Sequence, residues 1–324
     1  MSQESEKTAK RKTGVVDADE IISRGSGTTA KESDEDYAKN ASETRCFLTS
    51  VLFLTRLPCP MWFPLVGAIV GLMSALWFDF MASVLPLSLA ATASVAASVR
   101  LTGCFHEDGL GDTVDAFGGG WSLAQILRIM KDSRVGTYGS IALALFLIAK
   151  VHLLASLGPS EWRVGGGQGA GPALVAAHAL ARLSGPVLMR GCHYVIDEED
   201  LKGGFYNWFA RSKELLSVPR IVFSVVLASI IASLAIGVQQ ALVALAITMA
   251  SSLIAGIYGN QVIGGVIGDF LGATVCMIEL LIYSSICGKL PSSLAPAFRL
   301  GMAYLFLWCY KALVTRKTDD SKKA

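Results

Sequence analysis

Residues 102–120, TGCFHEDGLGDTVDAFGGG, gather four acids and six glycines in a chain that is otherwise strongly apolar. The acids and the adjacent histidine are His106, Glu107, Asp108, Asp112 and Asp115. On an α-helix, with about 100° between successive residues, Asp108, Asp112 and Asp115 fall within roughly 60° of one another. Such crowding of like charges favours a cation among the three carboxylates.

Carboxylate oxygens in a glycine-rich setting suit Mg²⁺ or Mn²⁺, and Mg²⁺ commonly accompanies a phosphate-bearing substrate. We therefore predict that Asp108, Asp112 and Asp115 hold Mg²⁺. The alternative is a solvated acidic helix end that the helix dipole stabilises. His106 is a candidate general base or metal ligand, or a polar residue at the membrane rim.

A basic segment follows at residues 129–139, IMKDSRVGTYG. Lys131 and Arg134 are suited to neutralise phosphate oxygens, while Ser133 and the backbone of Gly136 and Gly139 can donate hydrogen bonds. Taken alone, the segment is a weak signal, because the same charges are typical of the residues that flank a membrane span. Beside the acids it completes a diphosphate–metal site. The candidate substrate-binding residues here are Lys131, Asp132, Ser133, Arg134 and Gly136.

The composition indicates a membrane protein, with 52% hydrophobic and 17% charged residues and a mean hydropathy of +0.51. Soluble chains average roughly a quarter charged residues. A spanning helix needs about 20 mostly apolar residues. The runs that qualify or nearly qualify are 62–81, 85–102, 138–157, 172–190, 218–237, 239–258, 264–287 and 298–314. We expect an all-α, polytopic integral membrane helix bundle with about eight transmembrane helices.

Three regions follow from this pattern: a disordered polar tail at 1–45, a membrane-embedded catalytic domain at 46–315 and a basic tail at 316–324. The seven cysteines form no CxxC pair and imply no disulfide framework. A net charge of +2 gives no indication of nucleic-acid binding. The lipid bilayer is the expected partner, and no helix has the pattern of a dedicated dimer seam.

Basic residues in the connections predict the orientation. The positive-inside rule puts the connections 103–137, 191–217 and 259–263 on the cytoplasmic face, or on an equivalent organellar stromal or matrix face. Asp269 is expected to lie a short way into the membrane from that same face, which makes it a functional candidate beside the acidic segment.

Charged and imidazole side chains also occur inside the apolar runs. Arg182 should face the bundle interior and pair with an acid or with a substrate phosphate. Glu279 lies deeper than Asp269 on the same run, where either Arg182 or a neighbouring hydroxyl can satisfy it. His152 and His178 are expected to be hydrogen-bonded structural residues.

The acidic string, IMKDSRVGTYG and the later GDFLGATVCMIE resemble the motifs of the cobalamin synthase family, the adenosylcobinamide-GDP ribazoletransferases. TRLPCP and FPLVGAIVG resemble the opening of that family, and the resemblance covers roughly residues 45–315. Three positions depart from the family pattern. Cys104 stands where the family has glycine, Gly111 where alanine is usual, and Cys276 where a polar residue is frequent. None of them alters the three aspartates.

The resemblance implies joining of α-ribazole, or its 5′-phosphate, to adenosylcobinamide-GDP with release of GMP, which completes the nucleotide loop of adenosylcobalamin or its 5′-phosphate. It implies that Mg²⁺ on the aspartates stabilises the diphosphate and that Lys131 and Arg134 hold the GMP phosphate. It also implies that one of the acids or His106 accepts the proton of the attacking hydroxyl. The further substrate-binding candidates are Arg182, Asp269 and Glu279.

Two other functions are less consistent with the sequence. A CDP-alcohol phosphotransferase requires DGxxAR, but Asp112 and Thr113 occupy the Ala-Arg places here. A transporter places acids at broken helices, as Asp269 in GGVIGD suggests, and usually carries internal repeats. No convincing repeat relates the two halves of this chain, and the sequence therefore favours a synthase.

Overall fold

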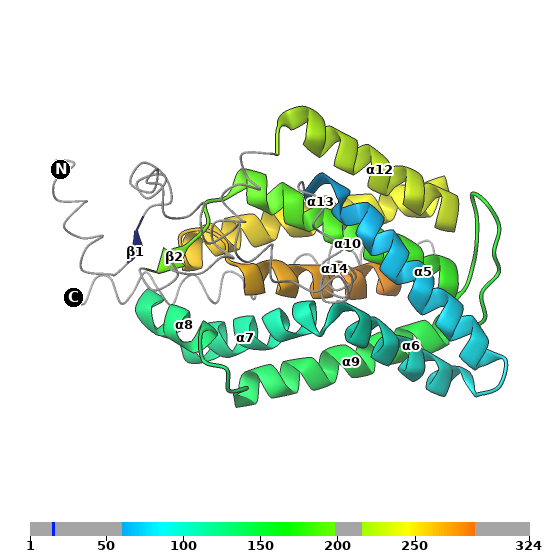
Figure 1. Cartoon of the computed structure of the whole chain (residues 1–324), viewed down its shortest axis with the longest axis horizontal. Coiled ribbons are helices and arrows are strands. Elements are labelled where there is room, and N and C mark those ends of the chain that lie inside the picture. The colour runs from blue at the N-terminus through cyan, green and yellow to red at the C-terminus, as the bar shows by residue number, and fades with distance from the viewer. Residues whose placement is uncertain (1–14, 17–59, 198–215, 289–324) are drawn as a thin grey trace, which may run out of the picture. The chain divides into compact units, whose positions relative to one another are not determined.

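The structure is a computed structural model that describes residues 15–16, 60–197 and 216–288. Helices make up almost all of it. The helical elements are η1 Pro60–Trp62, α5 Phe63–Ala82, α6 Leu87–Thr102, α7 Phe105–Gly119, α8 Leu123–Met130, α9 Thr137–Leu157, α10 Ala170–Gly191, α12 Val218–Ile236, α13 Val238–Val262 and α14 Gly268–Cys287 (Figure 1). Two short strands, β1 Val15–Val16 and β2 Ile196–Asp197, pair in antiparallel register.

The prediction of an all-α membrane bundle is confirmed. Seven of the predicted apolar runs form α5, α6, α9, α10, α12, α13 and α14. Among the described residues, six helices are long and apolar enough to cross a membrane, and α6 with α7, bent by 89°, forms a broken span or re-entrant loop. The eighth predicted run, 298–314, lies outside the described residues, as do the basic tail 316–324 and all of the N-terminal tail except β1.

The acidic segment was expected to lie in a connection between two spans, but it forms a helix that packs within the bundle. Residues 105–119 form α7, which packs along α9, and α8 then leads to the start of α9. The acids therefore lie along a helix of the bundle itself, from Glu107 and Asp108 in its first turn to Asp115 near its junction with α8 (Figure 1).

Helix α10 is the centre of the bundle, and nearly all of its residues are buried. Small residues permit this, because lipid supplies no hydrophobic drive between helices and close van der Waals packing must replace it. A Cβ atom at Gly71 of α5 would lie 2.6 Å from the Leu174 carbonyl oxygen of α10. Large apolar side chains on the outer faces remain exposed, as a bilayer requires, for example Trp77, Leu145, Val226 and Leu242.

A hydrophobic cluster separate from the core around α10 joins the elements at one end of the bundle. It includes Ala116 at the end of α7, Ile126 of α8, Met189 at the end of α10 and Phe270 at the start of α14. The turn before α14 is tied to the segment after α10 by a parallel bridge between Tyr194 and Val266. Because of this cluster, the acidic helix, the basic segment and the start of α14 share one end of the bundle. We call it the site end.

Candidate active site

The acidic helix begins at a sharp break. Gly103 and Cys104 both adopt left-handed backbone conformations, with φ of 68° and 64°. Glycine takes this conformation readily, whereas a residue with a Cβ atom pays about 1–2 kcal/mol for it. Cys104 is the only non-glycine residue with positive φ among those the structure describes. The break turns the chain by 89° from α6 into α7 and gives a physical reason for glycine at this position in the family pattern.

Two glycines bring α7 and α14 into backbone contact. A Cβ atom at Gly109 would lie 2.6 Å from the carbonyl oxygen of Asp269, and one at Gly272 would lie 3.2 Å from Cα of His106. The first distance leaves no room for any side chain. The glycines of the acidic string and of GDFLGA therefore allow the two helices to meet, and they place Asp269 beside the acids of α7, as predicted.

Asp112 lies at the centre of these acids. It is partly exposed, and the charges of Asp108, Asp269 and Asp115 all act on its carboxylate. Asp108 is exposed, while Asp115 is buried. The concentration of negative charge inferred from the sequence thus exists, with Asp269 as a fourth member from a distant segment.

Asp115 has a role that the sequence did not reveal. The Gly136 amide donates a hydrogen bond to its Oδ2 at 2.6 Å, and the Gly139 amide donates to its Oδ1 at 2.9 Å. These two amides were expected to receive a substrate anion at the start of α9. The protein's own carboxylate accepts from both instead, so Asp115 fastens the end of the basic segment to the acidic helix.

The basic segment contains its own ion pair. Arg134 donates from Nε to Asp132 Oδ1 at 2.9 Å and from Nη2 to Oδ2 at 2.6 Å, and its backbone amide also donates to Oδ1. These bonds lower the pKa of Asp132 to about 2, chiefly through the Arg134 side chain, and raise that of Arg134. Lys131 and Ser133 are exposed beside them. The turn presents its cations at the site end.

No group of three or more His, Cys, Asp or Glu side chains has the arrangement of a metal site in the part of the chain that the structure describes. Mg²⁺ seldom needs such a cage, because it usually binds through one or two carboxylates together with waters and substrate phosphates. Asp108 and Asp112 fit that mode. Each oxygen of Asp115 accepts one backbone hydrogen bond and keeps a second lone pair.

Arg182 and Glu279 meet in the bundle interior, as one of the sequence alternatives predicted. Arg182 Nη1 lies 3.3 Å from Glu279 Oε1, and His178 Nδ1 lies 3.0 Å from the same oxygen. Lys150 Nζ lies 2.7 Å from Glu279 Oε2. The expectation for His178 is confirmed, and His152 contacts the Ile148 carbonyl within its own helix. Lys150 was missed, although a lysine in the middle of an apolar run is itself a signal.

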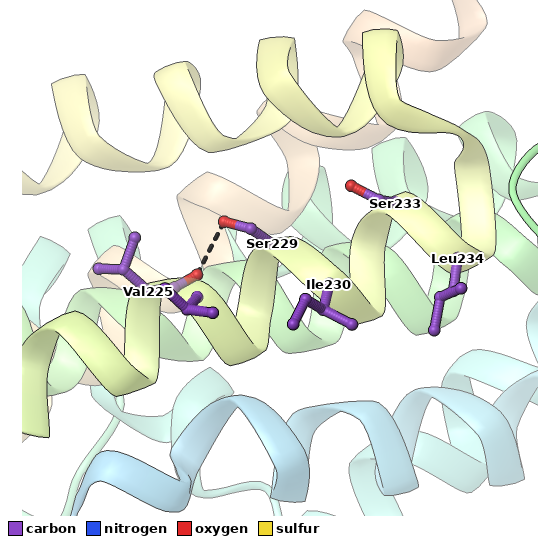
Figure 2. A pocket seen from close by; sticks show the side chains of 6 residues that line it. Val225, Ser229, Ile230, Ser233 and Leu234 are labelled. Carbon is purple, nitrogen blue, oxygen red and sulfur yellow. Dashed lines mark hydrogen bonds between the residues drawn. The ribbon is translucent and has the colours of Figure 1, made fainter.

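A shallow depression of about 320 Å³ lies elsewhere, on the surface of α12. Figure 2 shows its lining, where the Ser229 hydroxyl donates to the Val225 carbonyl of the preceding turn. It contains none of the candidate site residues. Its apolar lining and partly exposed position match a surface that faces lipid.

These observations define a polytopic membrane protein whose acidic and basic groups meet at one end of the helix bundle. The family model for cobalamin-5-phosphate synthase matches residues 46–287, and the chain belongs to that family. The match contains every candidate site residue and leaves out the N-terminal tail.

Similar curated proteins carry the name adenosylcobinamide-GDP ribazoletransferase. The one from Shewanella amazonensis is 36% identical over 256 residues, covering 74% of this chain and 94% of that protein. Those from Shewanella frigidimarina and Shewanella sp. W3-18-1 are each 35% identical, over 73% and 75% of this chain and 92% and 96% of their own lengths. No solved structure matches this chain.

Proposed function

We propose that this chain is an adenosylcobinamide-GDP ribazoletransferase. It joins α-ribazole, or α-ribazole 5′-phosphate, to adenosylcobinamide-GDP, releases GMP and forms adenosylcobalamin or its 5′-phosphate. Family membership and the names of the relatives support this assignment. The structural observation that carries it is the meeting of the α7 acids with Asp269 beside the basic turn.

The reaction transfers a phosphoryl group between two oxygens. A ribose hydroxyl oxygen attacks the cobinamide-linked phosphorus, the bond from that phosphorus to the GMP oxygen breaks, and GMP leaves with the electron pair. The hydroxyl proton passes to His106 or to one of the aspartates. Asp108 and Asp112, with Asp115 beside them, would hold Mg²⁺, which would neutralise charge on the diphosphate.

The remaining groups position the substrate. Lys131 and Arg134 contact the phosphate of the departing GMP, and the pairing of Arg134 with Asp132 limits the orientations of the guanidinium. Asp115 keeps this turn close to the acids. Asp269 contributes a further carboxylate from α14.

The site end is proposed to face the cytoplasm or an equivalent organellar compartment. Basic residues gather there, namely Arg128, Lys131, Arg134, Arg190 and Arg220. The connection between α9 and α10 contributes Arg163 at the opposite end. This asymmetry follows the positive-inside rule.

The test is an assay of the full chain purified in detergent with adenosylcobinamide-GDP and Mg²⁺, following GMP and cobalamin together. Parallel reactions contain α-ribazole or its 5′-phosphate, and each is repeated with EDTA and with Asp112→Asn. Glu161→Gln, an exposed substitution at the opposite end, is the matched control. We expect metal-dependent product that Asp112→Asn abolishes and Glu161→Gln preserves. Folded protein that forms no product with either acceptor refutes the proposal.

A further inference from the structure

Three helices meet in a small hydrophobic cluster at the level of the α7 acids, since its α7 member lies between Asp108 and Asp112. Leu110 of α7, Phe146 of α9 and Cys276 of α14 pack together in it. Helix α7 runs toward the site end, whereas α9 and α14 begin there and run away from it (Figure 1). One turn deeper along each helix stands a charged residue. These residues are Glu107, Lys150 and Glu279.

All three charged residues are buried. Lys150 spans from α9 to α14, with its side chain 1% exposed and its Nζ 2.7 Å from Glu279 Oε2. The other oxygen of Glu279, Oε1, lies 3.0 Å from His178 Nδ1 and 3.3 Å from Arg182 Nη1. Both oxygens of Glu279 are thus occupied, and Lys150 is the cation of this network on which Glu107 of α7 acts.

Glu107 completes the charge balance of the network. Lys150 and Arg182 bring two positive charges against the single negative charge of Glu279, and Glu107 supplies the second negative charge. The Glu107 carboxylate acts electrostatically on Lys150, and its Oε2 is buried without a hydrogen-bond partner in the described structure. A buried carboxylate without a partner is costly unless a cation compensates for it. The ammonium of Lys150 lies beyond ion-pair distance of Glu107 and is coupled to it electrostatically.

The start of α7 needs such an anchor. Because Gly103 and Cys104 break the helix, the rotation of its first turn is not inherited from α6. Yet that turn carries His106, whose Cα would be only 3.2 Å from a Cβ atom at position 272. A small rotation would move both His106 and Asp108.

We propose that Glu107 and Lys150 form a positioning pair for the proposed transferase reaction. Lys150, held by Glu279, fixes Glu107 and with it the first turn of α7, on which His106 and Asp108 stand. Neither residue of the pair contacts substrate. The inference rests on the proposed function for its kinetic readout, and on the buried ion network for its physical basis.

A double-mutant cycle tests the pair in the full chain. The variants are Glu107→Gln, Lys150→Met and both together, compared in kcat and KM for GMP release and in thermal midpoint in detergent. Each single substitution leaves one buried charge uncompensated, so kcat should fall about 10–100-fold through misplacement of the acidic turn. The KM for the acceptor should stay within about two-fold. The double variant restores the charge balance and should recover to within about five-fold of the unmodified protein.

The matched control is the exposed pair of Arg163 and Glu161, 3.5 Å apart at the opposite end. Removing either or both of those charges should change kcat by less than about two-fold. Losses in the double variant equal to the product of the single losses overturn the proposal, as do lowered midpoints with unchanged kcat. If Lys150→Met does not fold, Glu107→Gln decides alone, and an unchanged kcat overturns the pair. An inactive unmodified protein instead refutes the proposed function, and the midpoint cycle then still tests the pairing.

Discussion

Replacing Asp115 with asparagine removes one of the two carboxylate oxygens that hold the start of α9 against α7. In the structure each oxygen accepts one backbone amide, from Gly136 at 2.6 Å and from Gly139 at 2.9 Å. Asparagine offers a single acceptor, and its NH₂ group faces the second amide as another donor. One hydrogen bond is therefore lost, and the other no longer involves a charge.

The size of the effect follows from these contacts. A hydrogen bond to a charged group contributes about 1.5–3 kcal/mol, and a stranded buried donor costs a further 1–3 kcal/mol or so. Since Asp115 is buried, water does not replace the lost partner readily. We expect the free energy of unfolding to fall by about 3 kcal/mol, which lowers the thermal midpoint by roughly 6–12 °C.

Thermal unfolding in detergent with EDTA measures this loss without any contribution from bound metal. Asp112→Asn is the matched control, since it makes the same chemical change on the same helix face at a partly exposed site. Removing the Asp112 charge relieves repulsion from Asp108 and Asp269, so its midpoint should stay level or rise slightly. With Mg²⁺ added, Asp112→Asn should instead lose the stabilisation that the metal gives the unmodified protein.

The two aspartates are thereby assigned different tasks, one in holding the basic segment and the other in binding metal. An Asp115→Asn midpoint within about 2 °C of the unmodified protein would refute the anchoring role. Equal losses in both variants would show that the two aspartates act alike.

Three further predictions concern the break, the helix contact and the basic turn. Cys104→Gly should raise the free energy of unfolding by about 0.5–1 kcal/mol, because the cost of the left-handed conformation outweighs the extra chain entropy of glycine. Thermal unfolding measures this gain, and Cys104→Ala, which keeps a Cβ atom, should not show it. Gly109→Ala should lower kcat at least tenfold or so, because its Cβ would lie 2.6 Å from the Asp269 carbonyl oxygen. Gly119→Ala, with its nearest contact at 3.6 Å, is the control, and equal rates would contradict the contact. Because the pKa of Asp132 falls to about 2, the stabilisation from its pair with Arg134 should be complete above about pH 4 and disappear as the pH falls through 2. A carboxyl titration by NMR with a midpoint near 4 would contradict it.

Local pattern was sufficient for the parts of this protein that depend on a short stretch of chain. Apolar runs of about 20 residues predict spans because the bilayer fixes their length, and α5, α9 and α10 appear where they were expected. The helical spacing of Asp108, Asp112 and Asp115 likewise follows from the geometry of one turn. The sequence did not predict the break between α6 and α7, because no simple periodicity marks the two consecutive left-handed residues there.

The partners of the buried charges depend on contacts between helices far apart in the chain. Arg182 and Glu279 could each be recognised as costly inside a membrane, but Lys150 supplies a second cation for Glu279 from a separate helix. In the same way, the Gly136 and Gly139 amides looked available to a substrate until Asp115 was found to accept from them. Residue types and spacing therefore indicated a membrane enzyme with an acidic site. Which groups neutralise one another, and which remain for substrate, was set by the packing of the helices, because charge pairing acts through space over a few ångströms regardless of separation along the chain.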